Sequence, residues 1–148
     1  MRIQKMTGSG PAEWDFVQKG YTEAGRYVMR MEDGSSVFVK AATDEDTARW
    51  LRNEYRVYAH LKADFLTQFL VWDDDGRRPV LILEDLSKGF WPPPWSPEHI
   101  AHVRDVLKKV AATRPPPGTP SVLQFFQEPV GWEQVARDPS GFLGLQLA

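Results

Sequence analysis

Lys40 and Glu54 are the two side chains in this sequence whose types and positions best suit phosphate chemistry. Lys40 closes the run Val37-Phe38-Val39-Lys40, whose β-branched and aromatic residues are typical of a strand. A lysine at the end of a strand that borders a cleft can place a point charge on the phosphates of a nucleotide. Glu54 falls within the apolar stripe of the next segment, where an unpaired carboxylate is costly to bury. We therefore expect Lys40 and Glu54 to meet as an ion pair.

Each of these residues also has a plain structural interpretation. Lys40 can be a solvated strand end, and Glu54 can be a surface residue at the edge of its helical stripe. In that case the two side chains never meet, and the chain is an unrelated α+β domain. The separation between the two side chains decides between these interpretations.

A short segment with a glycine at each end, Gly20-Tyr21-Thr22-Glu23-Ala24-Gly25, lies in the first predicted hairpin. Backbone N–H groups that glycine leaves exposed can approach phosphate oxygens. The segment has neither the G-x-G-x-x-G pattern nor the glycine-lysine-serine/threonine ending of a phosphate-binding loop. An ordinary glycine turn is an equally good interpretation.

Alternating apolar patterns predict the elements that must position these residues. Strands are predicted at 14–17, 27–31, 36–40, 69–72 and 80–83. Helices are predicted at 44–62, 97–113 and 132–136. Residues 1–13 are predicted to be an irregular lead-in, and the proline-rich residues 87–96 a stiff connector. Asp33-Gly34 predicts a hairpin between the second and third strands. A period of two places Phe38 and Lys40 on one face of the third strand and Val37 and Val39 on the other.

The two longer helices carry recognisable start signals and apolar stripes. Thr43 or Asp44 caps the first, and Ser96 caps the second with Pro97 at its first helical position. Glu54 shares the stripe of the first helix with Trp50, Val57, Tyr58 and Leu61. The stripe of the second helix is formed by Ile100, Val103, Val106, Leu107 and Val110.

Taken together, these motifs resemble the aminoglycoside phosphotransferase and choline kinase-like family over roughly residues 14–112. The residues that carry the resemblance are Gly20-Tyr21-Thr22, Asp33-Gly34, Val37-Phe38-Val39-Lys40, Asn53-Glu54 with Val57-Tyr58 and Leu61, and Leu81-Ile82-Leu83-Glu84-Asp85-Leu86. The resemblance implies an α+β fold, namely a protein-kinase-like small lobe with a five-stranded antiparallel sheet and one packed helix. The implied organisation is a nucleotide-binding small lobe at 1–86, a hinge at 87–96 and the beginning of an incomplete helical large lobe at 97–148.

The resemblance also implies a cofactor, ATP or GTP with Mg²⁺, and roles for individual residues. Lys40 would contact the α- and β-phosphates, Glu54 would brace it, and the Gly20–Gly25 loop with Tyr21 and Thr22 would cover the phosphates. Backbone groups of Glu84 and Leu86 would bond the purine, with Leu83 at the back of its pocket. Phe38 would either stack on the base or partly fill the pocket.

The residues that would transfer a phosphoryl group are missing from this chain. Transfer in this fold needs a catalytic aspartate, which the family presents as His-x-Asp, then an asparagine and a second, metal-binding aspartate. The chain has no His-x-Asp, and its only asparagine is Asn53. His99, His102 and Asp105 fall on the second predicted helix as polar surface positions, and Asp73-Asp74-Asp75 is better explained as a charged turn than as a magnesium site. We therefore expect neither catalytic residues nor metal ligands on this chain.

Two functions follow from this pattern. One is the ATP-binding portion of a small-molecule phosphotransferase that transfers a γ-phosphoryl group to a substrate hydroxyl and is inactive as this chain alone. The other is a non-catalytic, kinase-like module that binds a nucleotide or a protein partner. The apolar residues at 141–148 would then be the start of a missing lobe, so the chain is interpreted as a fragment or split gene product rather than a stand-alone domain.

Composition limits the remaining possibilities. The net charge is −2 and no long basic block occurs, which argues against nucleic acid or an anionic membrane as the partner. The chain has no cysteine, and its longest clean apolar run, Val80-Leu81-Ile82-Leu83, is far shorter than the roughly 20 residues of a membrane helix. The N-terminus lacks the apolar core of a secretory signal, so a cytoplasmic location is the expectation.

Overall fold

The structure is a computed structural model and describes residues 2–18, 22–121, 124 and 131–140. Its elements are α1 (Arg2–Thr7), β1 (Pro11–Phe16), β2 (Gly25–Met31), β3 (Ser36–Ala41), α2 (Glu45–His60), β4 (Phe69–Asp73), β5 (Val80–Glu84), α3 (Pro97–Ala112) and α5 (Trp132–Arg137). The chain divides into two compact units, residues 1–116 and 117–148. None of the helices in the described ranges is long and apolar enough to cross a membrane.

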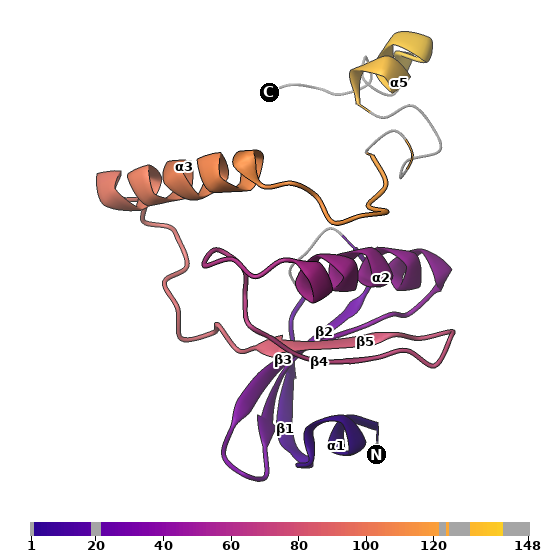
Figure 1. The fold of residues 1–148 in the computed structure, drawn as a ribbon, viewed down its shortest axis with the longest axis vertical. Coiled ribbons are helices and arrows are strands. Elements are labelled where there is room, and N and C mark those ends of the chain that lie inside the picture. Colours follow the sequence, from indigo (N-terminus) through magenta and orange to yellow (C-terminus); the bar gives the residue numbers. More distant parts are fainter. Residues whose placement is uncertain (1, 19–21, 122–123, 125–130, 141–148) are drawn as a thin grey trace. The chain divides into compact units, whose positions relative to one another are not determined.

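The first unit is built on one five-stranded sheet in the order β1-β2-β3-β5-β4 (Figure 1). Each neighbouring pair of strands is antiparallel. The predicted α+β class, with a five-stranded antiparallel sheet, is therefore confirmed. In this order β5 inserts between β3 and β4, which places the strand that ends at Glu84 beside the strand that carries Lys40.

The hairpin predicted at Asp33-Gly34 joins β2 to β3. The N–H of Met31 donates to the carbonyl of Ser35 over 2.8 Å, so three residues form the loop. Gly34 has a φ of 84°, which is the left-handed region that favours glycine. This loop pairs Arg30 with Ser36 and continues the register down both strands.

The two faces of the sheet bury different apolar clusters. Alternation along β3 holds as predicted, because Val37 and Val39 are buried on one face and Phe38 packs on the other. The first cluster consists of Met31, Val37, Val39, Val80 and Ile82. The second consists of Leu51, Leu81 and Leu83, with Phe38, Tyr55, Tyr58, Phe69 and Trp72 packed against it.

Helix α2 lies over the second of these faces and contacts β3 and β5 (Figure 1). Asp44 is its N-cap and accepts a hydrogen bond from the N–H of Thr47, while the Thr47 side chain accepts from the N–H of Asp44. The predicted stripe is only partly right. Ala48 and Leu51 are the buried apolar residues of the helix, and Tyr55 stacks on Trp72 with ring centroids 4.4 Å apart.

The expected irregular lead-in at 1–13 is wrong, because α1 occupies part of it and β1 begins at Pro11. A helix of this length is not stable through its own hydrogen bonds, so tertiary contacts must hold it. Arg2 supplies one such contact, since its guanidinium bonds the carboxylate of Asp73 at 2.6 Å and the carbonyl of Arg78 at 2.6 Å. Ile3 and Met6 supply the other by packing against the first apolar cluster.

Strand β1 forms one edge of the sheet. Its aromatic residues Trp14 and Phe16 are 60% and 56% exposed, and they alternate with Glu13 and Asp15. Arg30 on β2 lies 2.6 Å from the carboxylate of Glu13 and 3.9 Å from that of Asp15. The edge strand is thus largely solvated, with its acids paired to a neighbouring cation.

Helix α3 begins as predicted, with Ser96 as N-cap and Pro97 in the first turn. Its predicted apolar stripe is mostly exposed, since Ile100, Val103, Leu107 and Val110 are 40–59% accessible. Lys109 pairs with Asp64 at 2.6 Å. In the second unit, α5 confirms the short helix predicted at 132–136, whereas the apolar segment 141–148 lies outside the described residues.

Candidate functional site

The ion pair predicted from the sequence is present. The Lys40 Nζ atom lies 2.6 Å from the Glu54 Oε1 atom, and the two side chains are 24% and 31% exposed. The lysine comes from the penultimate position of β3 and the glutamate from the third turn of α2. The contact is partly shielded from water, so it is stronger than a fully exposed surface pair.

Both partners are placed by the packing of the elements that carry them. The register of β3 sets Lys40 opposite Leu81 of β5, on the face that α2 covers. Leu51 anchors α2 in the apolar cluster on that face. Glu54 lies three residues after Leu51, one helical turn along the same side, and therefore projects toward the lysine.

A cavity of about 710 Å³ lies beside this ion pair. Its lining consists of Val17, Arg26, Val28, Phe38, Lys40, Tyr58, Thr67, Leu83, Glu84, Asp85, Leu86, Ser87, Trp91 and Pro92. This volume falls within the range of sites that hold small molecules and cofactors, which is roughly 300–1,000 Å³. The lining combines apolar side chains with a few cations and hydrogen-bonding groups, as such sites do.

Phe38 is part of the cavity lining. It lies opposite Val28 on one side and Leu83 on the other, and it also packs against the second apolar cluster. Leu83 is buried and lines the cavity, as expected for a residue at the back of a pocket. The three side chains together form an apolar surface on the sheet.

The end of β5 and the residues after it form another wall, and several of its backbone groups are already bonded. The N–H of Glu84 donates to the carbonyl of Gln68 at 3.0 Å, and the Glu84 carboxylate accepts from the N–H of Gln68 at 2.6 Å. The Glu84 N–H is thus committed, so it is not open to a ligand as the expected contact of Glu84 with a purine could have used it. Asp85 is fixed as well, since its carboxylate bonds the Ser36 hydroxyl and the Ser87 N–H.

The glycine segment expected to cover phosphates is described only in part. Gly20 and Tyr21 lie outside the described residues. The carbonyl and the hydroxyl of Thr22 both accept hydrogen bonds from the guanidinium of Arg26. Gly25 is buried at the start of β2, where an added Cβ would come 3.0 Å from the ring of Tyr27. The close approach of that ring explains why a residue without a side chain occupies position 25.

Sequence reasoning missed Arg26, Thr67 and Trp91 as cavity residues. Arg26 lies directly opposite Lys40 in the pairing of β2 with β3, so the cavity has a second cation. The register of the Asp33-Gly34 hairpin was the signal that would have found it. Thr67 and Trp91 lie in loops, where no periodicity indicates which way a side chain faces.

Tyr58 lines the cavity and feels the charge of Glu54. Its ring packs against the second apolar cluster, and it is half-buried. Burial raises the pKa of the Tyr58 phenol, and the negative charge of Glu54 adds to this increase. The phenol therefore stays protonated near neutral pH, and it hydrogen-bonds the side chain of Thr67, another residue of the cavity lining.

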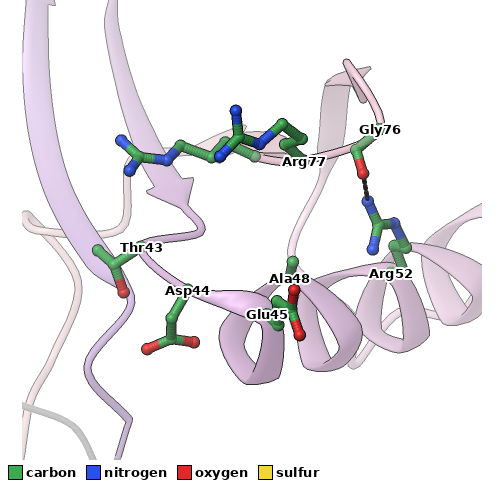
Figure 2. A pocket seen from close by; sticks show the side chains of 8 residues that line it. Thr43, Asp44, Glu45, Ala48, Arg52, Gly76 and Arg77 are labelled. Carbon is green, nitrogen blue, oxygen red and sulfur yellow. Dashed lines mark hydrogen bonds between the residues drawn. The ribbon is translucent and has the colours of Figure 1, made fainter.

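A second, smaller cavity of about 390 Å³ lies beside the first turn of α2 (Figure 2). Its polar groups are largely paired with one another or with the backbone. Asp44 caps its own helix, and Arg52 bonds both the Asp74 carboxylate at 2.7 Å and the carbonyl of Gly76 at 3.0 Å. Arg77 lies on the turn that precedes β5 and also lines this hollow. This hollow is therefore a structural junction between α2 and the turn.

The turn interpretation of Asp73-Asp74-Asp75 is supported by these contacts. Asp73 and Asp75 pair with Arg2, and Asp74 pairs with Arg52. Over the part of the chain that the structure describes, no group of three or more His, Cys, Asp or Glu residues is placed to hold a metal ion. The side chain of Asp105 bonds Lys108 on the same helix, and His99 stacks on Phe90.

No protein-family model, curated protein or solved structure matches this chain. Support for a function therefore comes from the cavity and the residues around it.

Proposed function

We propose that this chain binds a nucleoside triphosphate, as the small lobe of a phosphotransferase of the aminoglycoside phosphotransferase type. One observation carries the proposal: the Lys40–Glu54 pair borders a cavity large enough for a nucleotide. The apolar surface of Val28, Phe38 and Leu83 suits the faces of a purine. The Lys40 ammonium suits the phosphates, and Glu54 holds that ammonium in place.

The residues that would hold ATP or GTP thus have a fitting arrangement. The magnesium ion implied by the family does not, because the described residues group no ligand set for it. We assign no step to that ion. Binding by this chain consists of stacking the base, neutralising the phosphates with Lys40 and Arg26, and excluding water from the apolar wall.

The activity proposed for an enzyme of the aminoglycoside phosphotransferase type is transfer of a γ-phosphoryl group to a small polar molecule. The sequence of this chain has no His-x-Asp, and its single asparagine is on α2. These facts favour a second candidate, in which the chain binds nucleotide without catalysing its transfer. Both candidates require the same binding site and differ in whether the chain alone has turnover.

Calorimetric titration of the full 148-residue chain with ATP and MgCl₂ tests the proposal. We expect saturable binding that weakens about tenfold or more in Lys40→Ala, since a charge-assisted contact to phosphate is lost. Lys108→Ala is the matched control, because Lys108 is an exposed lysine of α3 whose ion pair is with Asp105 on the same helix. No binding by the folded wild-type chain would refute the proposal. Release of phosphate or phosphorylation of a hydroxyl-bearing acceptor would separate the two candidates.

A further inference from the structure

The carbonyl of Leu86 is closed off by two donors from the connector that follows it. The N–H of Gly89 donates to this oxygen at 2.8 Å, and the indole Nε1–H of Trp91 donates to it at 3.0 Å. Leu86 and Trp91 both line the cavity. The hydrogen bond from Trp91 therefore joins two residues of the cavity lining.

A carbonyl oxygen has two lone pairs, so two donors satisfy it. Gly89 lies close to the Leu86 carbonyl, because a Cβ added to Gly89 would come within 3.0 Å of the Leu86 oxygen. The Leu86 N–H, in contrast, has no hydrogen-bond partner among the residues that the structure describes. Leu86 thus combines an open donor with a saturated acceptor at the cavity lining.

This asymmetry selects between purines. Adenine carries an acceptor, N1, next to a C2 position that bears only hydrogen. Guanine carries two donors at the same edge, the N1–H and the 2-amino group. A donor that faces a saturated carbonyl has no acceptor, and a desolvated donor without a partner costs affinity.

We propose that Trp91 is the specificity-determining residue that makes this cavity accept adenine and reject bases with a 2-amino group. The inference rests on the proposed function, since it presumes that a nucleotide binds here. The Trp91 side chain is not held by burial, as the residue is 67% exposed. Its hydrogen bond to Leu86 is the feature that fixes the indole at the cavity wall.

The test uses three nucleotides on the full chain: ATP, GTP and the triphosphate of 2,6-diaminopurine riboside. The last keeps the adenine edge and adds only the 2-amino group. We expect the wild-type chain to bind ATP about tenfold more tightly than the diaminopurine nucleotide, the size of one unsatisfied donor. GTP should bind more weakly still, because its N1–H adds a second donor at the same edge. Calorimetry gives each dissociation constant.

Trp91→Phe keeps an aromatic ring and removes the indole donor. We expect it to bring the diaminopurine nucleotide to within about threefold of ATP, because one lone pair of the Leu86 oxygen is released. Trp95→Phe is the matched control, since Trp95 is an exposed tryptophan of the same connector that does not line the cavity. It should leave all three constants unchanged.

The outcomes separate the two proposals. If the folded chain binds none of the nucleotides, the proposed function fails and this inference fails with it. If nucleotides bind but the wild-type chain does not discriminate against the 2-amino group, or Trp91→Phe leaves the discrimination unchanged, this inference alone is overturned.

Discussion

Arg26 lies directly opposite Lys40 across strands β2 and β3, and both side chains line the same cavity. The two cations differ in how they are held. Lys40 is paired with the carboxylate of Glu54, whereas the Arg26 guanidinium bonds the carbonyl and hydroxyl of Thr22 and the carbonyl of Ala24. Arg26 therefore keeps its charge uncompensated by these partners, whereas the carboxylates of Glu84 and Asp85 in the same lining accept hydrogen bonds at the end of β5.

Replacing Arg26 should show this contribution to phosphate binding. We expect Arg26→Ala to weaken ATP binding about three- to tenfold and to reduce its dependence on salt, since one screened charge interaction is lost. Titrations at two ionic strengths measure both effects. Arg30→Ala is the control on the same strand, because Arg30 is exposed and paired with Glu13. A salt dependence equal to that of the wild type would contradict the role of Arg26.

Glu54 is expected to act on the nucleotide only through Lys40. Glu54→Gln removes the charge and keeps the shape, so the ammonium stays in reach but is less firmly positioned. ATP binding should weaken about threefold, less than in Lys40→Ala. Glu98→Gln, at the first turn of α3, is a control for the loss of one negative charge. Loss of binding in Glu54→Gln as large as in Lys40→Ala would show that Glu54 does more than hold the lysine.

The apolar cluster beneath the cavity should be necessary for stability. Leu81 is fully buried beside Lys40, and its truncation leaves a void that the sheet cannot close. We expect Leu81→Ala to lower the free energy of unfolding by about 2–5 kcal/mol, as measured by urea denaturation. Leu107→Ala on α3 should change it little, because that side chain is 59% exposed. An equal decrease in the free energy of unfolding for both variants would show that Leu81 is not part of the stabilising core.

Tyr58 should make the folded chain less stable at alkaline pH. Its pKa is raised in the folded chain by burial and by Glu54, so the unfolded chain loses this proton first as the pH rises. The corresponding stability is complete below the unfolded value of about 10 and is lost as the pH rises through the higher folded value. Thermal midpoints from about pH 9 to about pH 11 should therefore fall more steeply for the wild type than for Tyr58→Phe. Parallel curves would show that Tyr58 is not responsible.

The sequence was sufficient for the strands, the hairpin and the central ion pair, because each has a local signal. Period-two alternation in Val37-Phe38-Val39-Lys40 and the glycine at the Asp33-Gly34 turn are such signals. Glu54 was found because a charge within an apolar stripe requires a partner.

The features that escaped prediction depend on tertiary contacts. Helix α1 has little intrinsic stability and is held by Arg2, Ile3 and Met6. The stripe of α2 was displaced because Leu51 and Tyr55, which meet the sheet, are flanked by other apolar residues at similar spacing. To place Arg26 in the cavity, the loop length of the hairpin had to be known, because it sets the register of β2 with β3. To place Trp91, the path of the connector had to be known, and no periodicity in the sequence indicates that path.

The exposed edge strand β1 has a consequence for the behaviour of the protein at high concentration. Unpaired backbone groups at a sheet edge invite a strand from another molecule, and the aromatic rings of Trp14 and Phe16 would favour such stacking. The charges of Glu13, Asp15 and Arg30 interrupt that surface and oppose oligomerisation through it. Colloidal stability at this edge is consequently electrostatic in origin, and it weakens in concentrated salt.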